Sequence, residues 1–332
     1  MSDRPRIGIS RCLLGDAVRF DGGHKRDPLL ASTFGRFVEW VPVCPELEIG
    51  MGVPREPIHL VQSPTGVPSA GRLVRLLGVT SGIDWTSRMA EYSAARVAEL
   101  AGANLSGYVL KKDSPSCGMT RVRVHANRDH AARGGSKKGG SASRMGRGLF
   151  AEALMEALPN LPVEEEGRLH DPALRENFVE RVFAYQRLRA LFSRRWTRGA
   201  LVRFHTIHKL QLLSHSRVGY TALGRLVAAA AETRPLPLAA SYERTFMRAL
   251  ATTATPGRHA DVMLHIVGHL KKVIESADRE ELLASIEEHR RGVVPLTVPI
   301  TLIRHHVRRH SVEYLRDQVY LDPHPRDVGR RR

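Results

Sequence analysis

Three short apolar runs of this chain each lead into a cysteine, and no other feature limits the fold so strongly. The three pairs are Arg6–Ser10 with Cys12, Glu39–Val43 with Cys44, and Ser106–Leu110 with Cys117. Runs of this length and composition are typical of buried strands. In an open parallel sheet, ligands bind beyond the carboxyl ends of the strands. Thiols separated by 32 and 73 residues along the chain are therefore expected to meet at one edge of a sheet.

The first half of the chain is predicted to be an α/β domain with a mostly parallel sheet. Strand-like runs alternate there with segments of helical spacing, as in folds that cover a parallel sheet with helices. Asp84–Leu100 is one such segment, with Asp84 as a plausible N-cap. A helix over Leu149–Leu158 closes this domain, residues 1–160, and 159–167 is predicted to be a linker.

The second half, residues 168–325, is predicted to be an all-α domain. Asp171 and Pro172 are an N-cap followed by proline in the first turn, which is typical of a helix start. His205, His208 and His215 share one helical face. Three interpretations fit that pattern: the histidines bind a metal, they are partly buried, or they face RNA phosphate. The last two fit it better than metal binding.

Composition is that of a globular protein, and the distribution of charge favours a polyanion as its partner. With 332 residues and 42% hydrophobic content, it has room for two domains with cores of their own. Neither a secretory leader nor an apolar run of about 20 residues is evident, so a cytoplasmic location is expected. Residues 1–166 contain 22 Lys and Arg against 18 Asp and Glu, whereas residues 167–332 contain 29 against 16. This asymmetry indicates a polyanion docking on the second half, although a solvated basic surface is the alternative.

The chain has three cysteines and no fourth. A structural zinc site takes four ligands, and the local Cys and His spacing of zinc ribbons and fingers is absent. An iron–sulfur cluster held by three thiolates leaves one iron without a protein ligand, and such an iron could take up a soft substrate atom such as sulfur. Three unrelated cysteines, buried as small apolar side chains, are the alternative.

Residues close to the cysteines are candidates for catalysis and substrate binding. Glu46, two residues after Cys44, could activate water as a general base, or it could be a surface carboxylate. Ser114 and Ser116 could orient a substrate, or they could cap the turn around Pro115. For Lys111, Lys112 and Asp113, contact with substrate and a solvated rim are both open.

The basic, glycine-rich segment 127–148 is predicted to be a flexible insertion. It is either a spacer or a flap that grasps phosphate beside the Cys117 loop.

Four blocks of the first half, together with two of the second, resemble the iron–sulfur-dependent desulfidases of the TudS and RudS type. In the α/β domain the blocks are Ser10–Gly15, Val43–Glu46, Gly52–Arg55 and Lys111–Gly118. In the helical domain they are Phe204–Leu210 and Thr255–Asp261. The resemblance covers nearly the whole chain except the insertion.

The resemblance implies an oxygen-sensitive [4Fe-4S] cluster on Cys12, Cys44 and Cys117, with Glu46 and Ser114 as catalytic residues. Substrate contacts are expected from Ser10, Lys111, Asp113 and Ser116. The implied reaction removes sulfur from 4-thiouridine in tRNA, giving uridine and hydrosulfide with no net redox change. tRNA is the partner expected for the helical domain, and neither a membrane nor a protein partner is inferred. A desulfidase of free thiolated bases such as thiouracil, and a non-catalytic RNA-binding protein, remain the alternatives.

Overall fold

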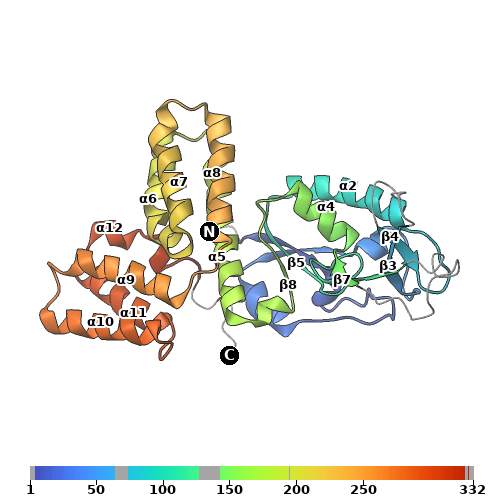
Figure 1. The fold of residues 1–332 in the computed structure, drawn as a ribbon, viewed down its shortest axis with the longest axis horizontal. Helices are drawn as coiled ribbons and strands as arrows, with labels where there is room; N and C mark the ends of the chain where they lie inside the picture. Colours follow the sequence, from blue (N-terminus) through green and yellow to red (C-terminus); the bar gives the residue numbers. More distant parts are fainter. Residues whose placement is uncertain (1–3, 64–73, 127–142, 194, 326–327, 329–332) are drawn as a thin grey trace. The chain divides into compact units, whose positions relative to one another are not determined.

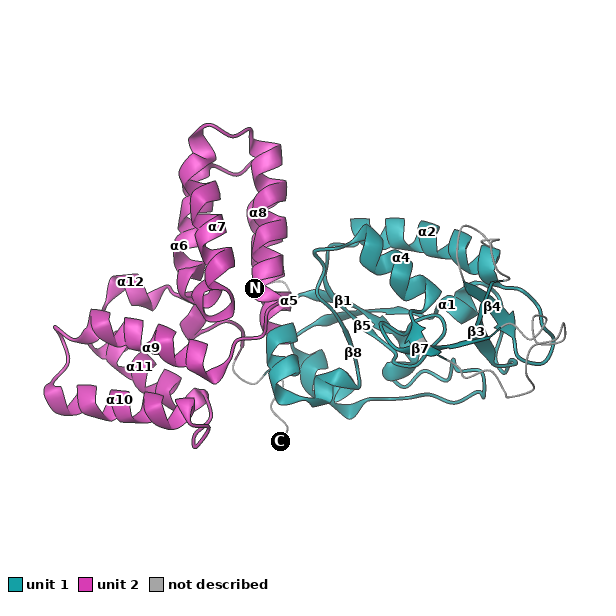
Figure 2. Cartoon of the chain, in the orientation of Figure 1, with its two compact units in different colours: residues 1–178, 327–332 teal, residues 179–326 magenta. Residues whose placement is uncertain are grey.

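The computed structural model describes residues 4–63, 74–126, 143–193, 195–325 and 328, which form two compact units (Figure 1, Figure 2). One unit is Met1–Phe178 with Asp327–Arg332, and the other is Val179–Arg326. The predicted fold class, an α/β part followed by an all-α part, is confirmed. The boundary between the units falls within helix α5 (Pro172–Phe192), and the predicted domain limits stay a prediction. Within the described ranges, no helix combines the length and apolar character that a membrane crossing demands.

The first unit is organised around a parallel sheet that contains the three apolar runs. Its strand order is β2-β1-β5-β8, and every neighbouring pair is parallel. The strands are β1 Arg6–Ser10, β2 Glu39–Val43, β5 Leu105–Leu110 and β8 Val163–Glu165. All six residues of β5 are buried, as in a central strand. Gly8 permits close packing, because a Cβ there would lie 2.1 Å from the ring of Tyr108.

The prediction of a linker over 159–167 is wrong, because this segment contains β8. It pairs with β5 through Tyr108 and Val163. The charge of Glu164–Glu166 conceals the strand in the sequence, yet these three residues are only 6%, 6% and 8% exposed. Buried carboxylates need hydrogen-bond donors. For Glu165 and Glu166 those donors come from distant parts of the chain, whereas Glu164 accepts from the nearby Arg168 at 2.6 Å.

A second sheet, also of four strands, was not predicted. Its order is β4-β3-β6-β7, with β3 and β6 parallel and the two outer pairs antiparallel. The strands are β3 Ile58–Gln62, β4 Val74–Gly78, β6 Val122–His125 and β7 Ser143–Gly146. The predicted role of 127–148 lies for the most part outside the described residues, since only 143–148 are described.

Helices α1 (Pro45–Glu48), α2 (Thr86–Gly102) and α4 (Leu149–Ala157) complete the first unit. In Figure 1, α2 and α4 lie side by side, and they contact one another. The N-cap of α2 is Trp85 and not the predicted Asp84, which lies one residue earlier and accepts a hydrogen bond from the backbone N–H of Thr86 at 2.9 Å. Short turns of 3-10 or π-helix follow β1 and precede β2, at Arg11–Leu13, Leu29–Thr33 and Phe34–Arg36.

The second unit is built of helices around two apolar clusters. Its helices are α6 Arg198–His215, α7 Arg217–Ala228, α8 Pro235–Leu250, α9 Pro256–Leu270, α10 Ser276–Arg290, α11 Thr297–Arg309 and α12 Glu313–Arg316. α6 belongs to both clusters, because Leu212 packs with α7 and α8 while Leu210 packs with α9 to α11. The hydroxyls of Thr197, Ser216 and Thr255 cap the starts of α6, α7 and α9.

The three histidines that share a face of α6 are core residues. His205, His208 and His215 are 4%, 0% and 1% exposed, so this face is not open to RNA. His205 Nδ1 lies 3.1 Å from the Tyr242 hydroxyl. His215 Nε2 lies 3.0 Å from Glu180 Oε2, and its Nδ1 lies 2.6 Å from the Thr252 carbonyl. Hydrogen-bonded, buried histidines are therefore the correct interpretation of this pattern.

The buried pair of Glu180 and His215 predicts how the stability of the second unit depends on pH. Burial disfavours both charges, but the ion pair outweighs it, so the pKa of Glu180 falls to about 2 and the pKa of His215 rises above 6.5. The contribution of Glu180 is present above its ordinary 4.5 and is lost as the pH falls toward 2. The contribution of His215 is present below 6.5 and is lost as the pH rises through its folded-state pKa.

We expect this pair to stabilise the unit most between pH 4.5 and 6.5. Glu180→Gln should make the free energy of unfolding less dependent on pH both below and above this range. On the acid side, the contribution that is removed is on the order of 2 kcal/mol. Urea denaturation over a series of pH values measures the free energy of unfolding of wild type and variant. If the two free energies change with pH in parallel, the pair contributes nothing to the pH dependence.

Candidate functional site

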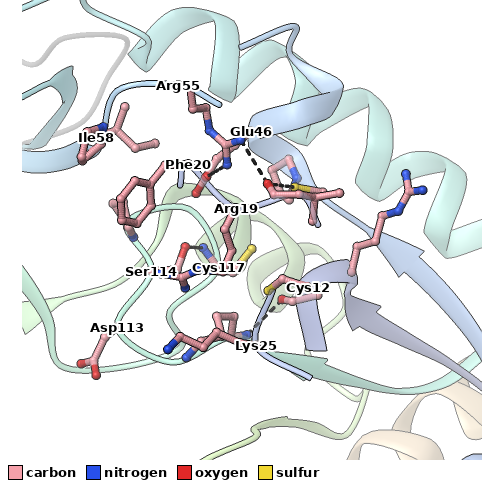
Figure 3. A pocket seen from close by; sticks show the side chains of 18 of the residues that line it. Cys12, Arg19, Phe20, Lys25, Glu46, Arg55, Ile58, Asp113, Ser114 and Cys117 are labelled. Carbon is pink, nitrogen blue, oxygen red and sulfur yellow. Dashed lines mark hydrogen bonds and ion pairs between the residues drawn. The ribbon is translucent and has the colours of Figure 1, made fainter. Parts of the chain in front are cut away.

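A cavity of about 370 Å³ lies at the carboxyl ends of β1, β2 and β5 (Figure 3). All three cysteines line it, as the strand pattern predicts. Eight of the nine predicted site residues are in its lining: Ser10, Cys12, Cys44, Glu46, Lys111, Asp113, Ser114 and Cys117. The structure thus brings together residues that are up to about a hundred positions apart, and their individual roles stay predictions.

Cys12 and Cys44 are held by the turns that follow their strands. The carbonyl of Cys12 accepts a hydrogen bond from the backbone N–H of Lys25 at 2.9 Å. Cys44 is the N-cap residue of α1, and its backbone N–H donates to Glu48 Oε1 at 2.9 Å. The other oxygen of Glu48 accepts from the Tyr92 hydroxyl at 2.6 Å. Glu48 therefore fixes the turn that presents Cys44.

Cys117 lies in a turn that Ser114 caps. The hydroxyl oxygen of Ser114 accepts from the backbone N–H groups of Ser116 and Cys117, at 3.2 and 3.0 Å. The capping interpretation of Ser114 is thus observed, while its side chain also lines the cavity. Ser116, predicted to bind substrate, is fully buried and is not among the residues that line the cavity.

The start of α4 completes the anchoring of this turn. Backbone N–H groups of Leu149 and Phe150 donate to the carbonyls of Pro115 and Ser116, at 3.2 and 3.1 Å. The first N–H groups of a helix have no partner within it, so the loop carbonyls satisfy them. Gly148 makes this approach possible, because a Cβ there would lie 2.5 Å from the carbonyl group of Ser116.

Gly148→Ala is expected to push the Cys117 turn away from α4. The added Cβ would also lie 2.8 Å from the backbone nitrogen of Cys117, so the turn must move. We expect a destabilisation of about 1–3 kcal/mol, as for other overpacked sites, and faster alkylation of Cys117, which is 6% exposed in the wild type. Gly102→Ala is the control, since nothing lies within 4 Å of the Cβ it would add. Equal urea midpoints and equal alkylation rates for the two variants would contradict this account.

Two buried glutamates, Glu165 at the end of β8 and Glu166 directly after it, bind the same loop. Glu166 accepts from Lys111 Nζ at 2.5 Å and from the backbone N–H of Lys112 at 2.7 Å. Glu165 accepts from the backbone N–H of Met119 at 2.7 Å, although burial raises its pKa. Lys111 therefore has a structural ion pair in addition to its place in the cavity lining. These contacts were not predicted from the sequence, because the charge of Glu164–Glu166 conceals strand β8.

Ser10 connects the end of β1 to this loop. Its side chain is 2% exposed, and its hydroxyl oxygen accepts from the backbone N–H of Lys111 at 3.0 Å. Asp113 is exposed and has a φ of 59°, a left-handed conformation. Ser10 thus lies at the floor of the cavity and Asp113 at its rim.

The three cysteines form no disulfide, and their donor set fits a metal cluster better than a single ion. Burial raises the pKa of Cys12 to about 11 and raises those of Cys44 and Cys117 as well. A bound metal would have to displace these protons, as thiolate ligation does in general. Within the described ranges, no three Cys, His, Asp or Glu side chains are arranged to hold one ion. Three thiols spread around one cavity suit a group with several irons, each taking one thiolate.

Glu46 is fixed in the cavity by Arg55. The two side chains form an ion pair and are 17% and 4% exposed. Nη1 of Arg55 also donates to the carbonyls of Val18 and Gly52, at 3.0 and 2.9 Å. Arg55 lies in the block Gly52–Arg55 that contributed to the resemblance, but sequence reasoning gave it no role. Its contacts make it the residue that orients the Glu46 carboxylate.

Phe20 is a second cavity residue without a predicted role. The residue is 37% exposed, and the guanidinium of Arg19 lies 5.2 Å from the centroid of its ring. The Phe20 carbonyl accepts from the backbone N–H of Arg55 at 2.9 Å, which holds this segment in place. Cations outnumber acids in the lining, with Arg11, Arg19, Lys25, Arg55, Lys111 and Lys112 against Glu46, Glu56 and Asp113. A flat apolar ring and a basic rim suit an aromatic ligand with negative charge.

Comparison with known proteins assigns both parts of the chain to families. Residues 7–166 match the family 2-thiouracil desulfurase, and residues 209–325 match a protein family of unknown function, DUF1722. The uncharacterized protein YbgA of Escherichia coli (strain K12) is 33% identical over 152 residues, which is 46% of this chain and 90% of YbgA. The uncharacterized protein YbbK of Bacillus subtilis (strain 168) is 32% identical over 112 residues, which is 34% of this chain and 72% of YbbK.

Among solved structures, the [4Fe-4S]-dependent thiouracil desulfidase TudS is similar, at 24% identity and a TM-score of 0.37 over 53% of this chain and 99% of its own. The match to the 2-thiouracil desulfurase family covers all of the cysteine blocks and agrees with the resemblance found in them. The chain belongs to the 2-thiouracil desulfurase family, with a DUF1722 domain following the desulfurase domain.

Proposed function

We propose that this protein removes sulfur from 4-thiouridine in tRNA, using a [4Fe-4S] cluster held by Cys12, Cys44 and Cys117. The observation that carries the proposal is the meeting of three thiols and one carboxylate in a single cavity of a desulfurase-family domain. When bound, a cluster with three thiolate ligands supplies an iron that has no protein ligand, a Lewis acid with affinity for sulfur.

The side chains of this chain supply the remaining chemistry. Glu46, oriented by Arg55, takes a proton from the water that attacks the thiocarbonyl carbon. A carbon–oxygen bond forms, the carbon–sulfur bond breaks, and sulfur leaves as hydrosulfide without a net change in oxidation state. Ser114 already accepts two backbone hydrogen bonds, so its hydroxyl proton is available to the substrate.

Phe20 and the basic rim support a nucleotide as the substrate. An aromatic ring can stack on the face of an unpaired base, and recognition of RNA bases commonly uses this contact. The 29 Lys and Arg against 16 Asp and Glu of residues 167–332 support binding of the tRNA backbone by the helical part. The thiolated base has to leave its stack to enter the cavity.

A desulfidase of free thiolated bases is the second candidate, because a cavity of about 370 Å³ is large enough for a free base. A non-catalytic RNA-binding protein is the third. The cytoplasmic location expected from the sequence stays a prediction.

Anaerobic incubation of the reconstituted protein with thiolated tRNA, and separately with thiouracil, tests the proposal. We expect loss of 4-thiouridine and gain of uridine by nucleoside mass spectrometry, with release of hydrosulfide. Turnover of thiouracil without turnover of tRNA would favour the second candidate. Binding of tRNA without hydrosulfide release would favour the third.

A further inference from the structure

A second cavity adjoins the first on the sheet β4-β3-β6-β7. Its volume is about 340 Å³, and it shares Ile58, Asp113 and Pro115 with the cavity of the cysteines. The shared residues form the wall between the two hollows. A ligand that fills the first cavity therefore has a natural extension into the second.

The chemistry of the second cavity comes from β3 and β6, which are parallel neighbours. Val122 and Val124 of β6 are 2% and 6% exposed, so the intervening Arg123 faces the opposite side of the sheet and is exposed. His59 of β3 and His125 of β6 bring their rings together, with centroids 5.0 Å apart and planes inclined by 39°. One guanidinium and a pair of aromatic rings thus line one hollow.

These groups match the parts of a nucleotide. A guanidinium binds phosphate oxygens through two parallel N–H donors. Imidazole rings are among the side chains on which unpaired RNA bases stack. The exposed Asp113 carboxylate at the junction repels phosphate, which leaves the Arg123 end as the place for the charge.

We propose that the second cavity binds the nucleotide next to the thiolated one in RNA, with its phosphate on Arg123 and its base against His59 and His125. This proposal rests on the proposed function and deepens it, because it gives the desulfurase domain its own contact with the RNA chain. A free thiobase would fill the first cavity only. Selection of RNA over the free base would then arise in part beside the cysteines.

Arg123→Ala tests the proposal in the full chain. We expect about tenfold weaker binding of a fluorescent uridine trinucleotide, the size of effect that one lost charged hydrogen bond produces. The slope of log affinity against log salt concentration should decrease by the amount that about one phosphate contact contributes. With thiolated substrates, KM for the trinucleotide should rise about tenfold at an unchanged kcat, while the kinetics with free thiouracil stay as in the wild type.

Arg121→Ala is the matched control, since Arg121 is exposed, lies two residues away and lines neither cavity. His125→Ala should lower trinucleotide affinity in the same direction as Arg123→Ala. Equal trinucleotide binding by wild type, Arg123→Ala and Arg121→Ala would overturn the inference. An equal rise of KM for the trinucleotide and for thiouracil would also overturn it. Failure of the proposed function would look different: the wild type would release no hydrosulfide from any thiolated RNA, while the binding comparison would still report on the second cavity.

Discussion

Replacing Glu46 by glutamine is expected to lower kcat by about a thousandfold, within the range that general acid–base catalysis contributes. Glutamine has nearly the same shape, and its carbonyl oxygen can still accept from Arg55, so the buried guanidinium keeps a partner. It cannot take a proton from water near neutral pH. Stopped assays of hydrosulfide release under anaerobic conditions measure the loss, and the absorbance of the reconstituted cluster should match the wild type.

Glu56→Gln is the matched control for this substitution. Glu56 also lines the cavity, but its Oε2 accepts from the backbone N–H groups of Thr80 and Ser81, both at 2.9 Å. We expect it to affect stability rather than turnover. The turnover of Arg55→Lys should lie between those of Glu46→Gln and Glu56→Gln, because lysine keeps the charge of arginine but not its forked geometry. Wild-type turnover in Glu46→Gln, with the cluster intact, would remove Glu46 from the mechanism.

The convergence of the cysteines could be predicted because it depends on local patterns and one topological rule. Strands β1, β2 and β5 read as apolar runs, and each is followed by a polar turn with a cysteine. Parallel strands place those turns at one edge whatever the distance along the chain. Assigning the strands and applying the rule for parallel sheets both require no knowledge of side-chain contacts. The sequence alone was therefore sufficient to predict that the cysteines meet.

Other parts of the site depend on partners that no local pattern shows. Residues 163–166 have the composition of a solvated segment, and the donors of the Cys117 loop explain the burial of Glu165 and Glu166. Arg55 gains its role from Glu46, nine residues away across a turn. His205 and His208 share a face of α6, and the sequence pattern is equally compatible with a surface and a core position for it. The face is buried because α8 packs against it through Tyr242. Long-range contacts of this kind override local preference.

Cys44→Ala is expected to abolish both cluster assembly and turnover while leaving the fold intact. Its sulfur makes a weak hydrogen bond to the Val18 carbonyl at 3.9 Å, and its backbone N–H keeps the bond to Glu48 in the variant. The loss should therefore come from the missing thiolate and not from unfolding. Iron and sulfide content after anaerobic reconstitution, the visible absorbance and the urea midpoint measure the three quantities separately.

The two variants together separate ligation from proton transfer. Glu46→Gln should keep the cluster and lose turnover, whereas Cys44→Ala should lose both, since two remaining thiols leave a second iron without a protein ligand. A Cys44→Ala protein that retains wild-type iron content and turnover would show that this sulfur is a small buried side chain. In that case the shared cavity would hold something other than a cluster on three cysteines, and the proposed reaction would lose its basis.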